Sequence, residues 1–252
     1  MLSLEGEKLE DHQSRRIGRQ VLRFPVLDST MDTARGLARG GAAEGTVVWA
    51  EEQRAGRGRR GRAWLSPRGG LTLSIILRPP ASRLPSLTMI ASVAVVRVLR
   101  RLAGLEARVK WPNDVLLAGK KVAGILVETS FTGEKLDYAI LGIGLNVNLD
   151  PRAFPEIAAT ATSLSQQLGR ELEVQAVLDA LLEELDRLYS GGQVFEEWRS
   201  LLDTLGKRVT VTGEGKDEEG VAWGVTPEGS LLLRRDSGEV VEIVAGEVSL
   251  RR

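Results

Sequence analysis

The spacing of turn residues changes abruptly after Gly206, and this change constrains the possible folds more than any other feature of the sequence. Between positions 209 and 250, short apolar segments alternate with glycine, proline and serine, a pattern typical of a small all-β unit. A unit this small is marginally stable alone, so we expect it to dock on the rest of the chain. We predict a C-terminal β-barrel of the SH3 type over residues 206–252, with strands at 209–212, 220–225, 230–234, 240–244 and 247–250.

The preceding residues, 1–205, predict a larger α+β domain with a mixed or antiparallel sheet. Apolar residues at helical spacing follow Thr30 and end before Gly40, and a long apolar stretch at 87–102 has the length of a buried helix. Residues 1–14 are polar, and we expect them to be frayed. Further amphipathic helices are expected at 175–189 and 194–205, and strands at 46–50, 71–77, 107–110, 115–117, 122–128 and 138–146.

The composition of the chain excludes several classes of function. The 252 residues include no cysteine, which rules out disulfides, thiolate zinc sites and cysteine nucleophiles. The one histidine, His12, lies in the polar N-terminal stretch, so histidine catalysis is not expected. The 34 Lys and Arg residues balance 34 Asp and Glu residues, which argues against binding nucleic acid through net charge. The acidic start is not a signal peptide, and no run of about 18 apolar residues would span a membrane, so we expect a cytoplasmic protein.

Five arginines fall within the nine residues from Arg54 to Arg62, and three glycines lie between them. Arginine carries a fixed positive charge with planar donor geometry suited to carboxylate and phosphate. Glycine leaves the backbone amides free to approach an anion. Because like charges this dense repel one another, we expect an anionic ligand to order the segment. The alternatives are a solvated basic loop and an RNA-binding segment rich in arginine and glycine.

A second cluster lies in the segment KWPND at 110–114 and in the segment GKKVAG at 119–124. Pro112 favours an extended backbone before it, and the glycine and lysine that open the second segment indicate a hairpin. The hairpin would bring Asp114 and Lys121 together beside one pocket. A carboxylate and an ammonium there could hold metal-bound phosphates and offset developing charge. The alternative is a surface ion pair on an ordinary hairpin.

Two further segments are weaker candidates for a site. The segment LGIGLNVN at 141–148 predicts a strand whose two glycines would let a planar ligand lie close to the backbone, and Asn146 could contact a base or phosphate. The segment Asp28-Ser29-Thr30 is ordinarily only a helix cap. Neither a P-loop pattern nor a dinucleotide-binding glycine pattern occurs in the sequence.

These four segments, in this order, resemble the signature motifs of the biotin–protein ligase family. The arginine segment, preceded by Gln53 and followed by Trp64, is similar to the family's biotin and adenylate loop. The resemblance covers roughly residues 20–250, including the closing GEVSL at 246–250. It implies a catalytic domain related to class II aminoacyl-tRNA synthetases, with an SH3-like barrel at the C-terminus. Met31 departs from the family pattern, which usually has asparagine after Ser-Thr.

The resemblance also implies roles for individual residues. Lys121 would bridge the biotin carboxylate and the α-phosphate, and Arg57 would hold one of these anions. Asp114 would orient or deprotonate the incoming lysine, or bind magnesium. Biotin would contact Ser29, Thr30, Gln53, Gly56, Arg57, Trp64, Lys121 and Gly124. ATP and the adenylate would contact Arg57, Arg59, Arg62, Asn113, Lys121 and Asn146.

The implied reaction uses ATP and biotin as substrates, with Mg²⁺ assisting the departure of pyrophosphate. Because the biotin carboxylate attacks the α-phosphorus, positive charge must offset the repulsion between two anions. The resulting biotinyl-5′-adenylate is a reactive anhydride, which the ordered arginine segment would shield from water. The implied acceptor is a lysine of a biotin carboxyl carrier protein domain. About 25 residues precede Asp28, too few for the winged helix with which some relatives bind DNA, and homodimer formation stays open.

Two other functions compete with this interpretation. A lipoate–protein ligase or octanoyl transferase shares the fold, but the contiguous arginine segment and KWPND favour biotin. An RNA-binding module could combine an arginine–glycine loop with a small barrel. The zero net charge and the lack of an aromatic stacking stripe weigh against RNA binding.

Overall fold

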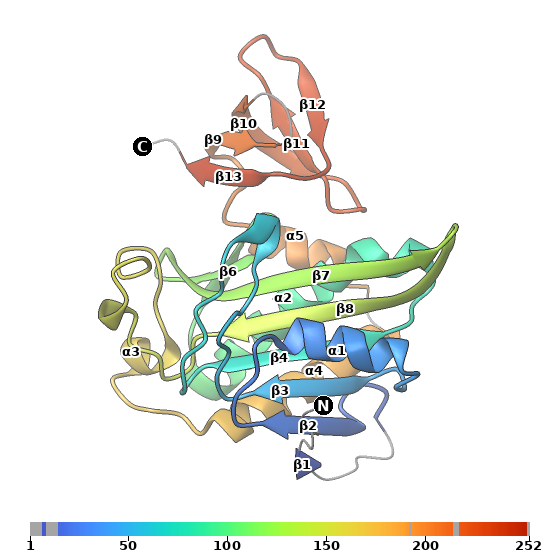
Figure 1. Ribbon diagram of the computed structural model, residues 1–252. Coiled ribbons are helices and arrows are strands. Elements are labelled where there is room, and N and C mark those ends of the chain that lie inside the picture. The colour runs from blue at the N-terminus through green and yellow to red at the C-terminus, as the bar shows by residue number, and fades with distance from the viewer. Residues whose placement is uncertain (1–6, 9–14, 192, 214–216, 251–252) are drawn as a thin grey trace.

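The structure is a computed structural model that describes residues 7–8, 15–191, 193–213 and 217–250. Its strands form a sheet of eight, in the order β1-β2-β3-β4-β8-β7-β6-β5, and a sheet of five, in the order β12-β11-β10-β9-β13 (Figure 1). The larger sheet contains β1 (Glu7–Lys8), β2 (Gln20–Phe24), β3 (Thr46–Ala50), β4 (Leu71–Leu77), β5 (Ala107–Lys110), β6 (Asp114–Leu117), β7 (Lys120–Thr132) and β8 (Lys135–Leu145). The smaller contains β9 (Arg208–Thr212), β10 (Glu218–Val225), β11 (Leu231–Arg234), β12 (Val240–Ile243) and β13 (Glu247–Leu250).

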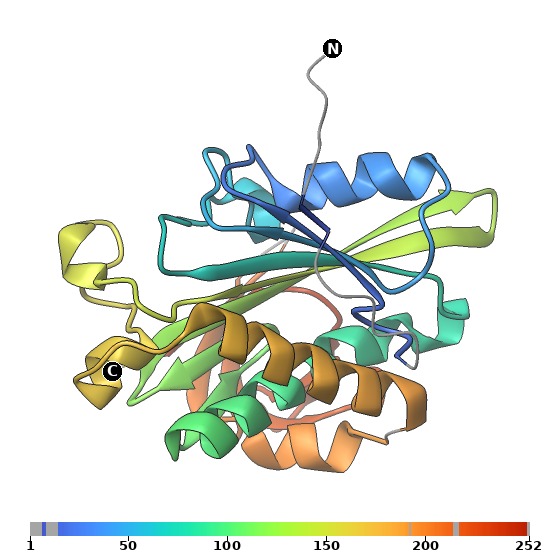
Figure 2. The same ribbon diagram turned by 90° about the horizontal axis from the view of Figure 1, so that it is seen from below.

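Helices cover both faces of the larger sheet (Figure 2). α1 packs on one face, against β3, β4 and β8, whereas α2, α4 and α5 lie together on the other. β2 and β3 run parallel and the other neighbouring pairs of the described strands run antiparallel, which confirms the α+β unit with a mixed sheet. The helices are α1 (Thr30–Arg39), α2 (Leu84–Ala103), α3 (Leu164–Leu168), α4 (Val174–Gly191) and α5 (Phe195–Leu201), with short 3-10 turns at Arg59–Gly61, Ala81–Arg83 and Pro151–Ala153.

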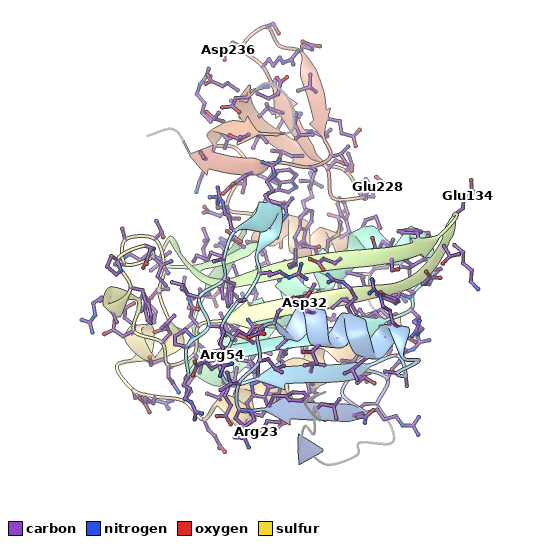
Figure 3. All side chains as sticks on the ribbon, in the orientation of Figure 1. Arg23, Asp32, Arg54, Glu134, Glu228 and Asp236 are labelled. Carbon is purple, nitrogen blue, oxygen red and sulfur yellow. The ribbon has the colours of Figure 1, made fainter. Side chains whose placement is uncertain are left out.

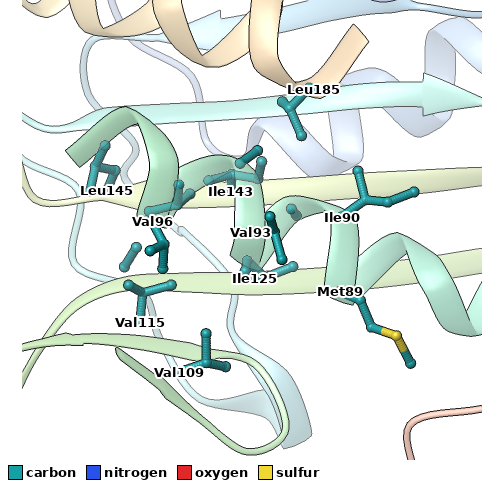
Figure 4. Close-up of a cluster of buried hydrophobic side chains, with 14 of the residues drawn as sticks. Met89, Ile90, Val93, Val96, Val109, Val115, Ile125, Ile143, Leu145 and Leu185 are labelled. Atoms are coloured by element: carbon teal, nitrogen blue, oxygen red, sulfur yellow. The ribbon is translucent and has the colours of Figure 1, made fainter. Parts of the chain in front are cut away.

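The two-residue period of the strands assigns their side chains to two cores. On β8, Leu141, Ile143 and Leu145 face the large core that α2 and α4 cover (Figure 4). Tyr138 and Ile140 point the other way, into a smaller core beneath α1. Along β8 the smaller core ends at Ile140, so it does not cover the rest of the sheet face that α1 packs on.

The apolar stretch Ala81–Ala103, which contains α2, is long and apolar enough to span a membrane by length and composition alone. In the structure, 61% of its most apolar window is buried inside the protein. It packs against α4, α5 and the larger sheet. Its apolar surface is therefore used in the core, as predicted for a buried helix.

The five C-terminal strands lie close to their predicted positions and form an antiparallel sheet. The sheet docks on the larger unit, as expected, and Trp111 is central to the contact. Its ring N–H donates a hydrogen bond to the Gly229 carbonyl, between β10 and β11, at 2.8 Å, and its backbone N–H donates to Thr204 Oγ1, in the segment that leads into β9, at 2.9 Å. The Trp111–Pro112 peptide bond is cis.

The helix predicted over 194–205 ends earlier, at Leu201. The chain leaves the helix because the residues that follow pair with β5. Asp203 N–H donates to the Val109 carbonyl at 2.8 Å, and Leu202 forms a parallel bridge with the same valine. This pairing positions the C-terminal sheet beside the KWPND segment.

One other expectation was wrong in part, and one short helix was missed. Glu7 and Lys8, within the segment predicted to be frayed, pair with β2 as β1, while the rest of residues 1–14, including His12, lie outside the described residues. α3 was not predicted, although Ser163 caps its start and Gly169 ends it. A helix of five residues is too short to produce a periodic pattern in the sequence.

Glu44, in the loop between α1 and β3, connects the two faces of the sheet. Its carboxylate accepts hydrogen bonds from the Tyr189 hydroxyl of α4 at 2.6 Å, the Arg78 N–H at 2.9 Å and the Arg16 side chain at 3.2 Å. Burial alone would raise the pKa of this carboxyl, but the hydrogen bonds, led by that of Tyr189, lower its pKa overall. Glu44 therefore contributes stability in its ionised form.

Candidate active site

The α1 face of the larger sheet is hollow where β7 and β8 carry glycine. After Tyr138 and Ile140, the next two positions of β8 on this face are Gly142 and Gly144. Gly124 of β7 lies opposite Gly144 in the antiparallel pairing. A cavity of about 140 Å³ lies over these glycines. Its walls are α1, the arginine loop (residues 54–62), the KWPND segment and the start of β13.

Trp64 occupies the space above two of the glycines. A Cβ atom at Gly144 would lie 2.3 Å from Trp64 Cε2, and one at Gly124 would lie 3.0 Å from Trp64 Cζ3. A side chain at position 144 would therefore displace the indole. The sequence predicted that the glycines of β8 would let a planar group lie close to the backbone, and one such group is a side chain of the protein itself.

A directed chain of hydrogen bonds forms part of the cavity wall. Ser74 Oγ donates to Thr30 Oγ1 at 2.8 Å, and Thr30 Oγ1 donates to Gln53 Oε1 at 3.0 Å. Thr30 N–H also donates to Gln53 Oε1, at 2.7 Å, which fixes the orientation of the amide because a backbone N–H can only donate. Gln53 Nε2 has no acceptor among the described residues and can donate to a ligand, while the two hydroxyls retain lone pairs that can accept.

The predicted hairpin brings Asp114 and Lys121 together, with Lys121 Nζ 2.7 Å from Asp114 Oδ1. The connection between β6 and β7 is the pair Ala118-Gly119, both with positive φ, as type I′ hairpin loops require. Lys121 Nζ also lies 5.4 Å from the centre of the Trp64 ring, a cation–π distance. The ammonium is thus held between a carboxylate and an aromatic face.

A β-bulge turns Lys121 toward the cavity. The register of β6 and β7 shifts between Val115 and Leu116, which leaves Val122 as an extra residue on β7. In a regular strand, Lys121 and Gly124 would face opposite sides because they are three residues apart. Here Lys121 Nζ would lie 3.3 Å from a Cβ at Gly124, and both residues line the cavity.

Arg57 of the arginine loop is held by two carboxylates. Its Nη2 lies 3.0 Å from Asp32 Oδ1 on α1 and 3.0 Å from Glu128 Oε2 on β7. Glu128 also pairs with Arg35 of α1. Figure 3 labels Asp32 on α1 and Arg54 at the start of the loop. The Nε atom of Arg57 is buried and has no hydrogen-bond partner in the described part of the chain, and other atoms of this arginine line the cavity.

Arg59 connects the arginine loop to both neighbouring segments. Its Nη1 donates to Asn113 Oδ1 at 3.1 Å and to the Gly246 carbonyl at 3.3 Å. Burial, followed by the like charge of Arg60, lowers the pKa of the Arg59 guanidinium. A cation destabilised in this way gains more than an exposed one from binding an anion.

The loop also reaches the C-terminal sheet directly (Figure 1). Arg60 Nη1 donates to the Thr212 carbonyl at 2.8 Å, and Arg62 pairs with Glu247. The repulsion between neighbouring arginines, which led us to expect ordering by an anionic ligand, is thus partly offset by protein groups. The C-terminal sheet forms one wall of the site.

Most of the predicted site residues line the one cavity. Three do not: Ser29, Gly56 and Asn146. The Ser29 hydroxyl caps α1 by accepting a hydrogen bond from the Asp32 N–H. A Cβ at Gly56 would lie 2.7 Å from Gln53 Nε2, so the lack of a side chain at position 56 leaves space for the Gln53 amide. Asn146 is buried and its Nδ2 donates to the Thr162 carbonyl at 3.0 Å. The predicted residues that line the cavity are Thr30, Gln53, Arg57, Arg59, Arg62, Trp64, Asn113, Asp114, Lys121 and Gly124.

The cavity also contains residues that the sequence did not single out as site residues. The sequence signal for Ser74 was only that it and Thr72 are polar residues in a strand that is otherwise apolar. No sequence signal indicated that the C-terminal sheet would place Glu247 in the cavity wall. The additional lining residues include Met31, Thr72, Ser74, Lys110, Leu126 and Glu247.

In the described part of the chain, the carboxylates that line the cavity are those of Asp114 and Glu247, and each is paired with a cation. Among the described residues, no group of three or more histidine, cysteine or acidic side chains could hold a metal ion. Magnesium in nucleotide sites is commonly held by one or two carboxylates together with phosphate oxygens. Asp114 therefore fits a magnesium ion that the nucleotide would help to bind.

Comparison with known proteins decides the family. Residues 23–146 match the biotin/lipoate A/B protein ligase family, and residues 204–251 match the biotin protein ligase C terminal domain. The chain is 37% identical to the bifunctional ligase/repressor BirA of Bacillus subtilis over 244 residues, which cover 93% of this chain and 75% of that protein. The chain belongs to the biotin protein ligase family.

Other biotin protein ligases agree in sequence and in structure. The chain is 34% identical to the biotin–[acetyl-CoA-carboxylase] ligase of Paracoccus denitrificans, over 88% of this chain and 96% of that one. A biotin protein ligase from Aquifex aeolicus, solved in complex with biotin and ATP, gives a TM-score of 0.79 at 33% identity, covering 92% of this chain and 98% of that chain. The family predicted from the four motifs is confirmed.

Proposed function

We propose that this protein activates biotin with ATP to biotinyl-5′-AMP and transfers biotin to a lysine of a biotin carboxyl carrier protein domain. One observation carries the proposal. A single cavity joins an uncharged polar end, formed by Ser74, Thr30 and Gln53, to a cationic end that contains Arg57 and Lys121. Biotin has the same polarity, with a neutral ring at one end and a carboxylate at the other.

The hydrogen-bond chain suits the cyclic urea of biotin. A urea presents one carbonyl acceptor and two N–H donors. Gln53 Nε2 can donate to the carbonyl, while Thr30 Oγ1 and Ser74 Oγ retain lone pairs that can accept from the N–H groups. Ser29, whose hydroxyl caps α1, and the backbone at Gly56 and Gly124 would complete this end of the site.

The cationic end suits the first chemical step. A carboxylate oxygen of biotin attacks the α-phosphorus of ATP, the bond from that phosphorus to the bridging oxygen breaks, and pyrophosphate leaves. Lys121 lies over the Trp64 ring, where a carboxylate and an α-phosphate would meet, and Arg57 lines the same cavity. Fixed cations in a partly enclosed site offset the repulsion between the two anions and the charge that develops as they react.

We assign the remaining nucleotide contacts mainly to other residues that line the cavity. Arg59 and Arg62 would hold the phosphates, and Asn113 would hold the nucleotide. Asn146 would contribute through its backbone or after giving up its bond to the Thr162 carbonyl. A magnesium ion held by Asp114 and the phosphates would supply charge compensation for the leaving pyrophosphate.

The second step attaches biotin to the carrier. The amine of the acceptor lysine attacks the acyl carbon of the adenylate, an amide bond forms, and AMP leaves. Asp114, 2.7 Å from Lys121, is placed to orient the amine or to accept its proton. Until the carrier arrives, the arginine loop and the C-terminal sheet would shield the anhydride from water.

The finer features of the fold belong to the same proposal. We assign residues 1–205 to a catalytic domain related to class II aminoacyl-tRNA synthetases and residues 206–252 to an SH3-like domain. We infer a cytoplasmic enzyme, and we leave its self-association to measurement of mass in solution.

The proposal is tested by incubating the protein with ATP, biotin, Mg²⁺ and a purified carrier domain. Mass spectrometry should show one biotinyl group on one lysine of the carrier. A carrier variant with that lysine replaced by arginine is the control and should stay unmodified. An unmodified carrier in the complete reaction would contradict the proposed function.

A further inference from the structure

Met31 closes the buried end of the cavity at a position where the family pattern has asparagine. It is the second residue of α1, and its side chain is only 4% exposed. It packs with the smaller core and also lines the cavity. Trp64, which is half-buried, lies toward the charged end near Lys121. The two side chains therefore define opposite ends of the space that a bound acid would fill.

The Met31 side chain takes the space that a side chain on β8 would otherwise fill. A Cβ at Gly142 would lie 2.6 Å from Met31 Sδ and 3.4 Å from its Cγ. Gly142 pairs with Leu126 of β7 on one side and with Ser74 of β4 on the other. The thioether thus lies over the strand between an apolar side chain and the start of the polar hydrogen-bond chain.

The smaller core prevents Met31 from moving away from the cavity. Ala34, Val48 and Ile76 in that core have no measurable exposure, and Phe24 is only 6% exposed. Packed interiors have little free volume. A group introduced at Gly142 would therefore push the end of Met31 into the cavity rather than into the core.

We propose that Met31, seated on Gly142, is a specificity-determining residue that contacts the apolar, thioether edge of the biotin ring and limits the size of acid that can be activated. The inference rests on the proposed function. The urea edge of the ring has polar partners in Thr30 and Gln53, so the opposite edge faces Met31 and Leu126. A polarizable thioether suits a ring edge that itself carries sulfur.

The test is a double-mutant cycle on biotin binding, measured by calorimetry. Gly142→Ala should weaken biotin binding about tenfold by displacing Met31, and Met31→Ala should weaken it about tenfold by removing the contact. In the double variant, the new methyl group has room because Sδ is absent. Its affinity should stay within about threefold of that of Met31→Ala, whereas independent effects would multiply to about a hundredfold.

Two controls separate this role from a general loss of structure. Gly36→Ala places the same methyl group on α1 where nothing lies within 4 Å, and it should leave biotin affinity unchanged. Met31→Leu keeps the volume and apolar character but removes the thioether, so its biotin affinity should lie between those of the parent and Met31→Ala. Additive losses in the double variant, or full affinity in Gly142→Ala, would overturn the proposal.

A second measurement applies even if Gly142→Ala fails to fold. Biotin sulfone carries two extra oxygens on the thioether edge, so the parent should bind it much more weakly than biotin. In Met31→Ala the ratio of the two affinities should fall at least about tenfold, because the vacated volume accepts the oxygens. An unchanged ratio would refute the role of Met31. A parent protein that binds no biotin would instead contradict the proposed function itself.

Discussion

Replacing Lys121 by alanine should slow adenylate formation by a factor of about 10²–10³ while changing biotin affinity less than about fivefold. The magnitude is that of removing one preorganised group that stabilises charge in a transition state. Lys121 Nζ lies between Asp114 Oδ1, at 2.7 Å, and the Trp64 ring, at 5.4 Å. Its loss therefore leaves a negative carboxylate beside the place where two anions must react. In the proposed binding mode the ring of biotin lies at the other end of the cavity, so the affinity for biotin should be largely retained.

The assay is single-turnover formation of biotinyl-5′-AMP from ATP and saturating biotin, with calorimetry for binding. The neighbouring Lys120→Ala is a matched control, because Lys120 is exposed and does not line the cavity. It should react at the parent rate. Lys121→Ala and Lys120→Ala should also unfold at similar temperatures, since the partly exposed ion pair of Lys121 with Asp114 contributes at most about 1 kcal/mol to the free energy of unfolding. Biotin affinity lost in step with the reaction rate would refute the assignment of Lys121 to the chemical step.

Three further predictions follow from the site and the fold. Arg59→Gly should release the adenylate early and biotinylate bystander proteins, because Arg59 links the loop to the C-terminal sheet; a release assay that shows unchanged retention would count against this. Gly144→Ala should weaken biotin binding about tenfold or more by displacing the Trp64 indole, whereas Gly224→Ala, which has room for a methyl group, should not; equal affinities would disprove the packing argument. Glu44→Gln should lower the free energy of unfolding at pH 7 by roughly 1 kcal/mol. Because folding lowers the pKa of Glu44, its stabilisation is complete above the ordinary value of 4.5 and is lost as the pH falls through the folded-state pKa. The free energies of unfolding of the parent and of Glu44→Gln, measured by denaturation, should therefore converge in acid. A difference that stays constant with pH would contradict this role of Glu44.

The sequence predicted local features of the site well. The hairpin that joins Asp114 to Lys121 follows from turn residues a few positions apart, and the structure shows the pair in contact. The close approach at the glycines of β8 also follows from a local pattern, although it could not be known that the indole of Trp64 lies there.

Contacts that depend on strand register or on docking could not be predicted. The bulge at Val122 changes which face Lys121 occupies, and no turn signal marks it. The partners of Arg57 come from α1 and from β7, and those of Arg60 and Arg62 come from the C-terminal sheet, far away in the chain. Such pairings are set by the assembled sheet rather than by neighbouring residues.

The central claim is that one cavity binds biotin and couples its carboxylate to ATP. Exchange of labelled pyrophosphate into ATP measures this step alone, without a carrier protein. We predict exchange that requires biotin, is not supported by lipoate or octanoate, and falls about 10²–10³-fold in Lys121→Ala but not in Lys120→Ala. Exchange that proceeds without biotin, or equally well with lipoate, would contradict the account.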